Sequence, residues 1–113
     1  MLCNVLNDCF YAGETYRMAV YAIQSDGQAL NLTGYTSAMK LKKPTDEWSD
    51  AALSLTSTPA AGLTITAATG RVDVQIESSQ SEDLEGQYDY KLEITSSGGI
   101  VTRLLAGTLS ITA

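Results

Sequence analysis

The side chains that could carry out chemistry in this 113-residue chain are few and scattered. There is no histidine, so neither a serine nor a cysteine can be paired with the histidine base of the common nucleophilic enzymes. Two cysteines and the carboxylates fall short of the usual zinc ligand sets, and neither standard glycine-rich phosphate loop occurs. The sequence therefore predicts a protein that is not an enzyme and that holds no metal or cofactor.

Carboxylates gather in two polar segments, 44–50 and 78–85, which contain Asp46, Glu47, Asp50, Glu82, Asp83 and Glu85. The first segment lacks the spaced ligands and the glycine of a known calcium loop. In the second, acids near the start of a helical turn complement the helix dipole. Asp73 and Asp89 alternate with apolar residues, as on the wet face of a strand. We interpret all of these carboxylates as solvated surface groups.

Exposed aromatic residues are the better candidates for a binding surface. Trp48 is the only tryptophan and lies in a polar segment, where it could fold back over the edge of the core, contact another subunit or stack on a sugar. Tyr11, Tyr21 and Ile23 fall outside the predicted core, and the face of residues 15–24 that carries Tyr21 and Ile23 is partly apolar. We predict that Tyr11, Tyr21, Ile23 and Trp48 contribute to an interface.

Composition excludes several classes of protein. The formal net charge is −6, and only Lys40, Lys42 and Lys43 cluster, so we expect no nucleic-acid partner and interpret these lysines as a solvated strand face. No apolar run approaches the ~20 residues of a membrane helix, and no secretory signal is recognisable. Cys3 and Cys9 would lie about 20 Å apart on one extended strand, although a turn at residues 7–8 would bring them closer; we expect reduced thiols.

The elements that position these residues are strands. In the segment 86–112, Tyr88, Tyr90, Leu92 and Ile94 occupy every second position, which is the period of a strand with one buried face. Residues 96–99 supply a turn, residues 100–105 return as a second strand, and Gly107 is expected to break or bulge it.

Similar alternation recurs along the chain. It places Tyr16, Met18, Val20 and Ala22 on one face of a strand, and Tyr35, Met39 and Leu41 on one face of the next. Asp26-Gly27 predicts a hairpin with a type I′ turn. Shorter strands are expected around residues 53–55, 63–65 and 72–76. Residues 78–85 predict one short helical turn, capped by Ser78 or Ser79 and anchored by Leu84.

Together these elements predict an all-β fold, an immunoglobulin-like antiparallel β-sandwich with at most one short helical turn; a small barrel is the structural alternative. Residues 1–12 are expected to form an N-terminal strand or arm that could pair with a neighbour. Residues 13–113 are expected to form a single β-sandwich domain, which is large enough to bury a core without a disulfide or metal.

Several phrases resemble a known family. They are Gly13-Glu14-Thr15, Asp26-Gly27, Leu32-Thr33-Gly34-Tyr35, Gly86-Gln87-Tyr88-Asp89-Tyr90, and Arg103-Leu104-Leu105-Ala106-Gly107 before Leu109 and Ile111. Read in order over residues 13–112, the chain resembles the small immunoglobulin-like β-sandwich proteins of tailed-phage virions. These include the N-terminal domain of baseplate upper proteins and related tail and neck modules.

This resemblance implies a non-enzymatic structural subunit of a baseplate, tail, neck or head decoration, made in the host cytoplasm and carried in the virion. It implies other virion proteins as partners, a homo-oligomer, and function through subunit contacts rather than catalysis. The larger members of the family continue into receptor-binding or coiled-coil regions, whereas this sequence stops at Ala113. A carbohydrate-binding or adhesive β-sandwich module is the alternative that the aromatic residues suggest.

Overall fold

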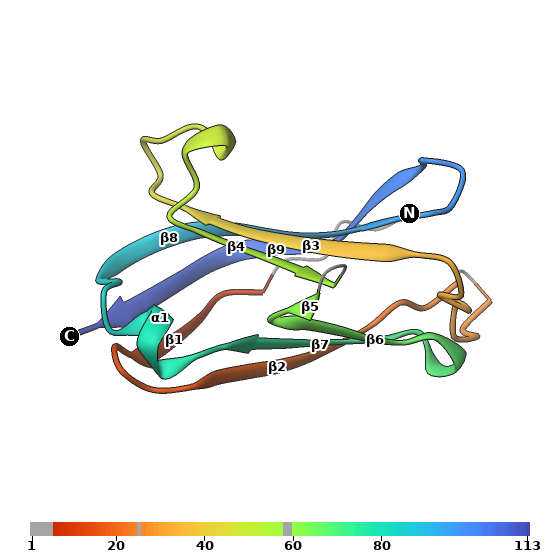
Figure 1. Ribbon diagram of the computed structural model, residues 1–113, viewed down its shortest axis with the longest axis horizontal. Coiled ribbons are helices and arrows are strands. Elements are labelled where there is room, and N and C mark those ends of the chain that lie inside the picture. Colours follow the sequence, from red (N-terminus) through yellow and green to blue (C-terminus); the bar gives the residue numbers. More distant parts are fainter. Residues whose placement is uncertain (1–5, 25, 58–59) are drawn as a thin grey trace.

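The computed structural model describes residues 6–24, 26–57 and 60–113, which fold into two β-sheets packed face to face (Figure 1). The larger sheet consists, in spatial order, of β1 (Asp8–Tyr11), β9 (Val101–Thr112), β8 (Gly86–Thr95), β3 (Thr36–Lys42), β4 (Leu53–Ser57) and β5 (Ala60–Ala61). The smaller sheet consists of β2 (Tyr16–Tyr21), β7 (Arg71–Ile76) and β6 (Leu63–Thr66). The predicted all-β sandwich is confirmed.

One pair of neighbouring strands departs from the predicted antiparallel arrangement. β1 runs parallel to β9, with Asp8 opposite Leu109 and Tyr11 opposite Thr112, whereas the other pairs of described strands are antiparallel. β1 and β9 run in the same direction at the edge of the larger sheet. After β1 the chain turns at residues 12–15 and enters β2 of the smaller sheet. Residues 8–11 of the predicted N-terminal strand or arm thus pair within the chain, and residues 1–5 lie outside the described part.

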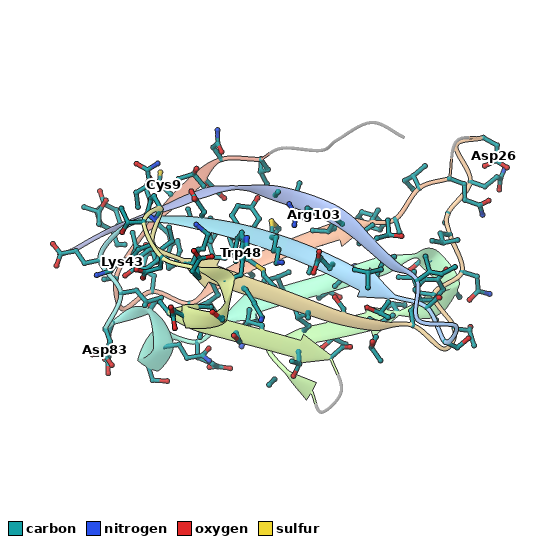
Figure 2. All side chains as sticks on the ribbon, turned by 90° about the horizontal axis from the view of Figure 1, so that it is seen from above. Cys9, Asp26, Lys43, Trp48, Asp83 and Arg103 are labelled. Atoms are coloured by element: carbon teal, nitrogen blue, oxygen red, sulfur yellow. The ribbon has the colours of Figure 1, made fainter. Side chains whose placement is uncertain are left out.

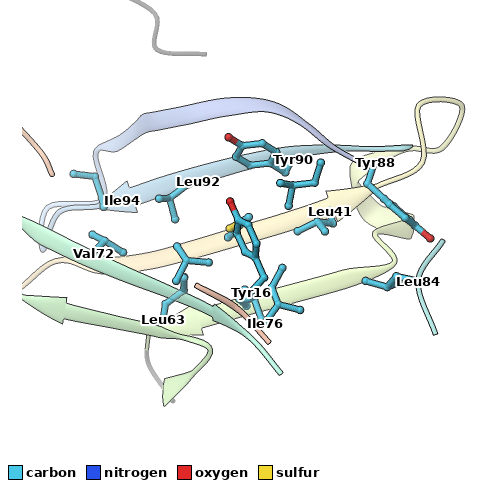
Figure 3. Packing of buried hydrophobic residues seen from close by; sticks show 14 of the residues in the cluster. Tyr16, Leu41, Leu63, Val72, Ile76, Leu84, Tyr88, Tyr90, Leu92 and Ile94 are labelled. Carbon is cyan, nitrogen blue, oxygen red and sulfur yellow. The ribbon is translucent and has the colours of Figure 1, made fainter. Parts of the chain in front are cut away.

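The core lies between the two sheets and contains most of the residues that alternation assigned to it, although Met18, Val20 and Tyr35 are only half-buried (Figure 3). Tyr90, Leu92 and Ile94 of β8 are at most 1% exposed and face Val72 and Ile76 of β7 across the sandwich. Full burial of each such side chain stabilises the fold by roughly 1.5–3 kcal/mol. The period-2 pattern was a correct guide because each strand has one face against this core.

The hairpin of β8 and β9 confirms the strand–turn–strand prediction but not its irregularity. β9 continues through Gly107, and the pairing shifts instead between Leu92 and Glu93, opposite Leu104. Gly107 is required for another reason: a Cβ atom there would overlap the main-chain carbonyl of Leu6. The glycine therefore makes room for an N-terminal segment that the local sequence does not reveal.

Residues 6–12 close the open side of the sandwich. The Leu6 N–H donates to the Ala106 carbonyl at 2.9 Å, and the Leu6 carbonyl accepts from the Tyr90 hydroxyl at 2.6 Å. Thr108 N–H donates to the Asn7 side-chain carbonyl at 3.0 Å. The buried Tyr16 hydroxyl donates to Asp8 at 2.9 Å, which ties the segment to β2 as well as to β9. This segment therefore links the two sheets.

The helical turns are short. α1 (Ser78–Ser81) and the buried Leu84 confirm the predicted turn and its anchor, but the N-cap is Glu77, whose N–H donates to Gln80 Oε1. The serine caps predicted for residues 78–79 were wrong because the turn starts one residue earlier. The fully buried Ser81 hydroxyl donates to the Glu14 carbonyl at 2.7 Å, which fixes α1 against the β1–β2 connection. Two 3-10 turns, η1 (Trp48–Asp50) and η2 (Ala67–Thr69), were not predicted, since three residues are too short for a helical period.

The connection after β2 contains the predicted hairpin with a different turn. Ile23 bridges to Ala29, and Gln24 N–H donates to the Gln28 carbonyl. Gly27 N–H donates to the Gln24 carbonyl, and Gly27 has φ +86°, whereas Asp26 does not have positive φ. A type I′ turn needs positive φ at both central residues, so this prediction was wrong. Asp26 instead accepts from Gln28 N–H through its carboxylate.

The strand directions give the molecule two different ends. One end carries the connections 12–15, 43–52 and 77–85, and the other carries 22–35, 67–70 and 96–100. Figure 2 shows Lys43 and Asp83 at the first end and Asp26 at the second. Since the long dimension of the molecule is 40 Å, the two sets of connections are well separated.

We predict that Gly107→Ala destabilises the protein by roughly 1–3 kcal/mol, because the added methyl group must displace the Leu6 carbonyl from β9. Urea unfolding measures the loss. Gly98→Ala is the matched control: its Cβ atom would find nothing closer than 3.8 Å, so the change is expected to stay within about 0.5 kcal/mol. Equal stabilities of the two variants would contradict this account of Gly107.

We also predict a loss of stability in alkali. Burial first, and the charge of Asp8 second, raise the pKa of Tyr90 to about 12, and burial with the Asp8 hydrogen bond raises that of Tyr16 further. An unfolded tyrosine has a pKa of about 10, so the folded state holds these protons more tightly. Stability is therefore complete below pH 10 and falls as the pH rises towards 12.

The measurement is the urea midpoint at pH 8 and pH 11 for the native chain, Tyr90→Phe and Tyr11→Phe. The exposed Tyr11 serves as control. Tyr90→Phe should reduce the alkaline loss by about 1 kcal/mol at pH 11, whereas Tyr11→Phe should leave it unchanged. An alkaline loss that is the same in all three proteins would show that Tyr90 is not the group responsible.

Candidate functional site

The structure brings together only two of the four residues predicted to form an interface. Tyr21 ends β2 and Ile23 follows two residues later; their side chains are 52% and 57% exposed. Tyr11 is 64% exposed at the end of β1, by the opposite set of connections. Trp48 lies in η1, in the β3–β4 connection. The predicted residues therefore belong to three separate places on the surface.

Two further apolar residues lie at the same end of the molecule as Tyr21 and Ile23. Ile100 and Val101 are 70% and 57% exposed, in the turn and first strand residue after β8. Sequence reasoning missed them because it assigned Ile100 to a strand, whereas the Ile100 N–H donates to the Ser96 hydroxyl within the turn. We call Tyr21, Ile23, Ile100 and Val101 the apolar end. Its three connections contain a single charged residue, Asp26.

The opposite end is strongly acidic. Its connections carry one lysine, Lys43, and eight exposed carboxylates, at Glu14, Asp46, Glu47, Asp50, Glu77, Glu82, Asp83 and Glu85. This acidic end thus has a net side-chain charge of −7, whereas the whole chain has −6. Within the described residues, no three of the Asp, Glu and Cys side chains are grouped so that they could hold a metal ion. The six acids of segments 44–50 and 78–85 that were predicted to be solvated are all exposed.

Trp48 folds back onto the outer face of the larger sheet. Its ring centre lies 5.0 Å from Lys42 Nζ of β3 and 4.7 Å from Lys91 Nζ of β8. A cation over an aromatic ring contributes roughly 0.5–1 kcal/mol at an exposed site. These lysine side chains are only 12% and 18% exposed, which indicates that the indole covers them. The fold-back interpretation of Trp48 is the one that this geometry favours.

Ion pairs run across the same outer face. Lys42 lies 3.4 Å from Asp89, and Glu93 lies 3.8 Å from Lys91 and 3.7 Å from Arg103. Lys40 is also on this face and is half-buried, so the prediction of a solvated lysine face is wrong for Lys40 and Lys42; of the three lysines, Lys43 alone is exposed. Such partly exposed pairs contribute at most about 1 kcal/mol each. Their main effect here is to balance the charge over the sheet.

The outer face of the smaller sheet is slightly hollowed, with a cavity volume of about 610 Å³ that is open to solvent. Arg17, Arg71, Asp73 and Gln75 line it from β2 and β7. The Arg71 guanidinium donates to Asp73 at 2.8 Å, and this carboxylate is the main cause that raises the pKa of Arg71. The hollow is a twisted strand surface rather than an enclosed pocket, and Arg71 and Asp73 form an ion pair on it.

The thiol prediction has one outcome within the described residues: Cys9 is a free, exposed cysteine. Cys3 lies outside the described part of the chain. None of the described helices is long and apolar enough to cross a membrane.

In comparisons with known proteins, no family model matches the chain and no curated protein is found as a relative.

We predict that the lysines control the environment of Trp48. Replacing Lys91 by Ala removes a cation and its alkyl chain from the ring, so acrylamide should quench the tryptophan fluorescence more strongly. The single tryptophan makes the signal unambiguous. Arg17→Ala, which removes an exposed cation from β2 of the smaller sheet, is the control and should quench as the native chain does. Identical quenching in all three proteins would contradict the contact.

Proposed function

We propose that the chain is a non-enzymatic structural subunit of a multi-copy assembly, of the kind found in tailed-phage virions. The observation that carries this proposal is the polarity of the molecule along its 40 Å axis. One end exposes four large apolar side chains and has a single charged residue, Asp26, in its connections, whereas the connections of the other end hold all of the net negative charge. The resemblance of residues 13–112 to small virion β-sandwich modules supports the same proposal.

The two ends would do different things in an assembly. Exposed apolar side chains at one end of a molecule favour contact surfaces, and burying Ile23 and Ile100 contributes roughly 1.5–3 kcal/mol each. Two acidic ends repel one another over about a Debye length, ~8 Å at physiological salt. Neighbours are therefore favoured at the apolar end and disfavoured at the acidic end, unless the partner there is basic. A subunit with this polarity has a defined orientation in a particle.

The direct test is mass spectrometry of purified virions of the phage that encodes the chain. We expect the protein in more than one copy per particle, because its contacts are surfaces that repeat rather than a catalytic centre. Recovery of the chain only from the soluble fraction of infected cells, with none in washed particles, would contradict the proposed function.

The contribution of the apolar end has its own expected result. Ile100→Asp places a charge where the proposed contact excludes water, so incorporation into particles should fall by roughly tenfold or more. Gln87→Asp, at an exposed position of β8, is the matched control and should be incorporated normally. If both variants are incorporated like the native chain, the apolar end is not a contact.

A further inference from the structure

The edge strands of the two sheets differ in whether their outward-facing N–H and C=O groups have hydrogen-bond partners. At the outer edge of β1, the Cys9 N–H donates to the Asp8 carboxylate at 2.8 Å and the Tyr11 N–H donates to Glu14 at 2.9 Å. Side chains of the same chain thus occupy the donors that another strand would use. At the other edge of the larger sheet, β5 has only two residues. Both features are ways in which proteins prevent pairing at sheet edges.

The edge of β2 has no such protection. The Ala22 N–H donates to the Gly70 carbonyl. The main-chain N–H and C=O groups of the even-numbered residues of β2 therefore point towards β7. The N–H and C=O groups of Arg17, Ala19 and Tyr21 consequently point away from the sheet. In the ranges 6–24, 26–57 and 60–113 these main-chain groups make no hydrogen bond. β2 is six residues long and contains no proline, glycine or bulge.

We propose that β2 pairs with β2 of a second copy of this chain, antiparallel, around a two-fold axis at Ala19. The proposal rests on the proposed function, since it specifies one contact of the multi-copy assembly. With Ala19 opposite Ala19 of the second copy, Arg17 stands opposite its Tyr21 and Tyr21 opposite its Arg17. Residues directly opposite in such a position exchange both hydrogen bonds. All three open donors and all three open acceptors of each copy are then satisfied.

Side-chain complementarity selects the second copy and this register. The guanidinium of Arg17 lies opposite the ring of Tyr21, a favourable cation–π pair, and the small Ala19 side chains meet at the axis. On the inner face, the half-buried Met18 and Val20 come together. A shift of two residues in one direction brings the two Arg17 side chains to diagonal positions about 7–8 Å apart, which is unfavourable. A shift the other way places Arg17 opposite Ile23.

Cysteine cross-linking tests the contact and its register together. In a Cys3→Ser, Cys9→Ser background, Ala19→Cys places two thiols across the axis, with Cα atoms about 5.5 Å apart, within the range for a disulfide. The control is Thr64→Cys, which is exposed on β6 in the same row of the same sheet. Under mild oxidation we expect roughly tenfold more covalent dimer from Ala19→Cys than from the control. Equal yields would overturn the proposal.

Ala19→Lys keeps the internal pairing of β2 but sets two ammonium groups against each other at the axis. Light scattering of the native chain over a concentration series should show a dimer, and this variant should weaken it by about tenfold or more. A native chain that remains monomeric at millimolar concentration overturns the proposal. A lysine variant that dimerises like the native chain also overturns it. Neither result touches the proposed function, which depends on recovery of the chain from virions.

Discussion

The rest of this structure depends on the main-chain hydrogen bonds at the side of the sandwich formed by β1, β9 and β2. Residues 6–12 run along β9 of the larger sheet, and hydrogen bonds of Leu6, Asn7 and Asp8 hold them to both sheets. Gly107 is needed to admit them. Because β1 then pairs with β9, and its outer donors are occupied by carboxylates, the larger sheet is closed on this side. The smaller sheet is left with an open edge at β2.

Much of the sandwich could be predicted from sequence because burial on one face imposes a period of two. That argument succeeded for Tyr88 to Ile94 of β8, for Tyr16 in β2 and for Met39 in β3. It failed for Gly107, where the decisive neighbour is a hundred residues away in sequence. It also failed for the turn at Asp26-Gly27, because the dipeptide suits more than one turn and only the hydrogen bonds distinguish them.

The candidate site was harder to predict than the core. Trp48 was predicted to be an exposed binding residue, yet the ammonium groups of Lys42 and Lys91 lie over its ring. These two lysines come from strands that are far apart in sequence. Ile100 was overlooked because an apolar residue next to a turn resembles the start of a strand. The separation of charge between the two ends emerges only when strand directions are known, since its carboxylates come from three distant connections.

Amide hydrogen exchange of β2, followed by NMR at low and high protein concentration, measures directly whether this edge is open. At low concentration we expect slow exchange at Met18 and Val20 and fast exchange at Arg17, Ala19 and Tyr21. At high concentration the latter three should become protected together as the edges pair. Slow exchange at Arg17, Ala19 and Tyr21 in the dilute monomer would mean that the edge of β2 is covered within the chain and is not open for pairing.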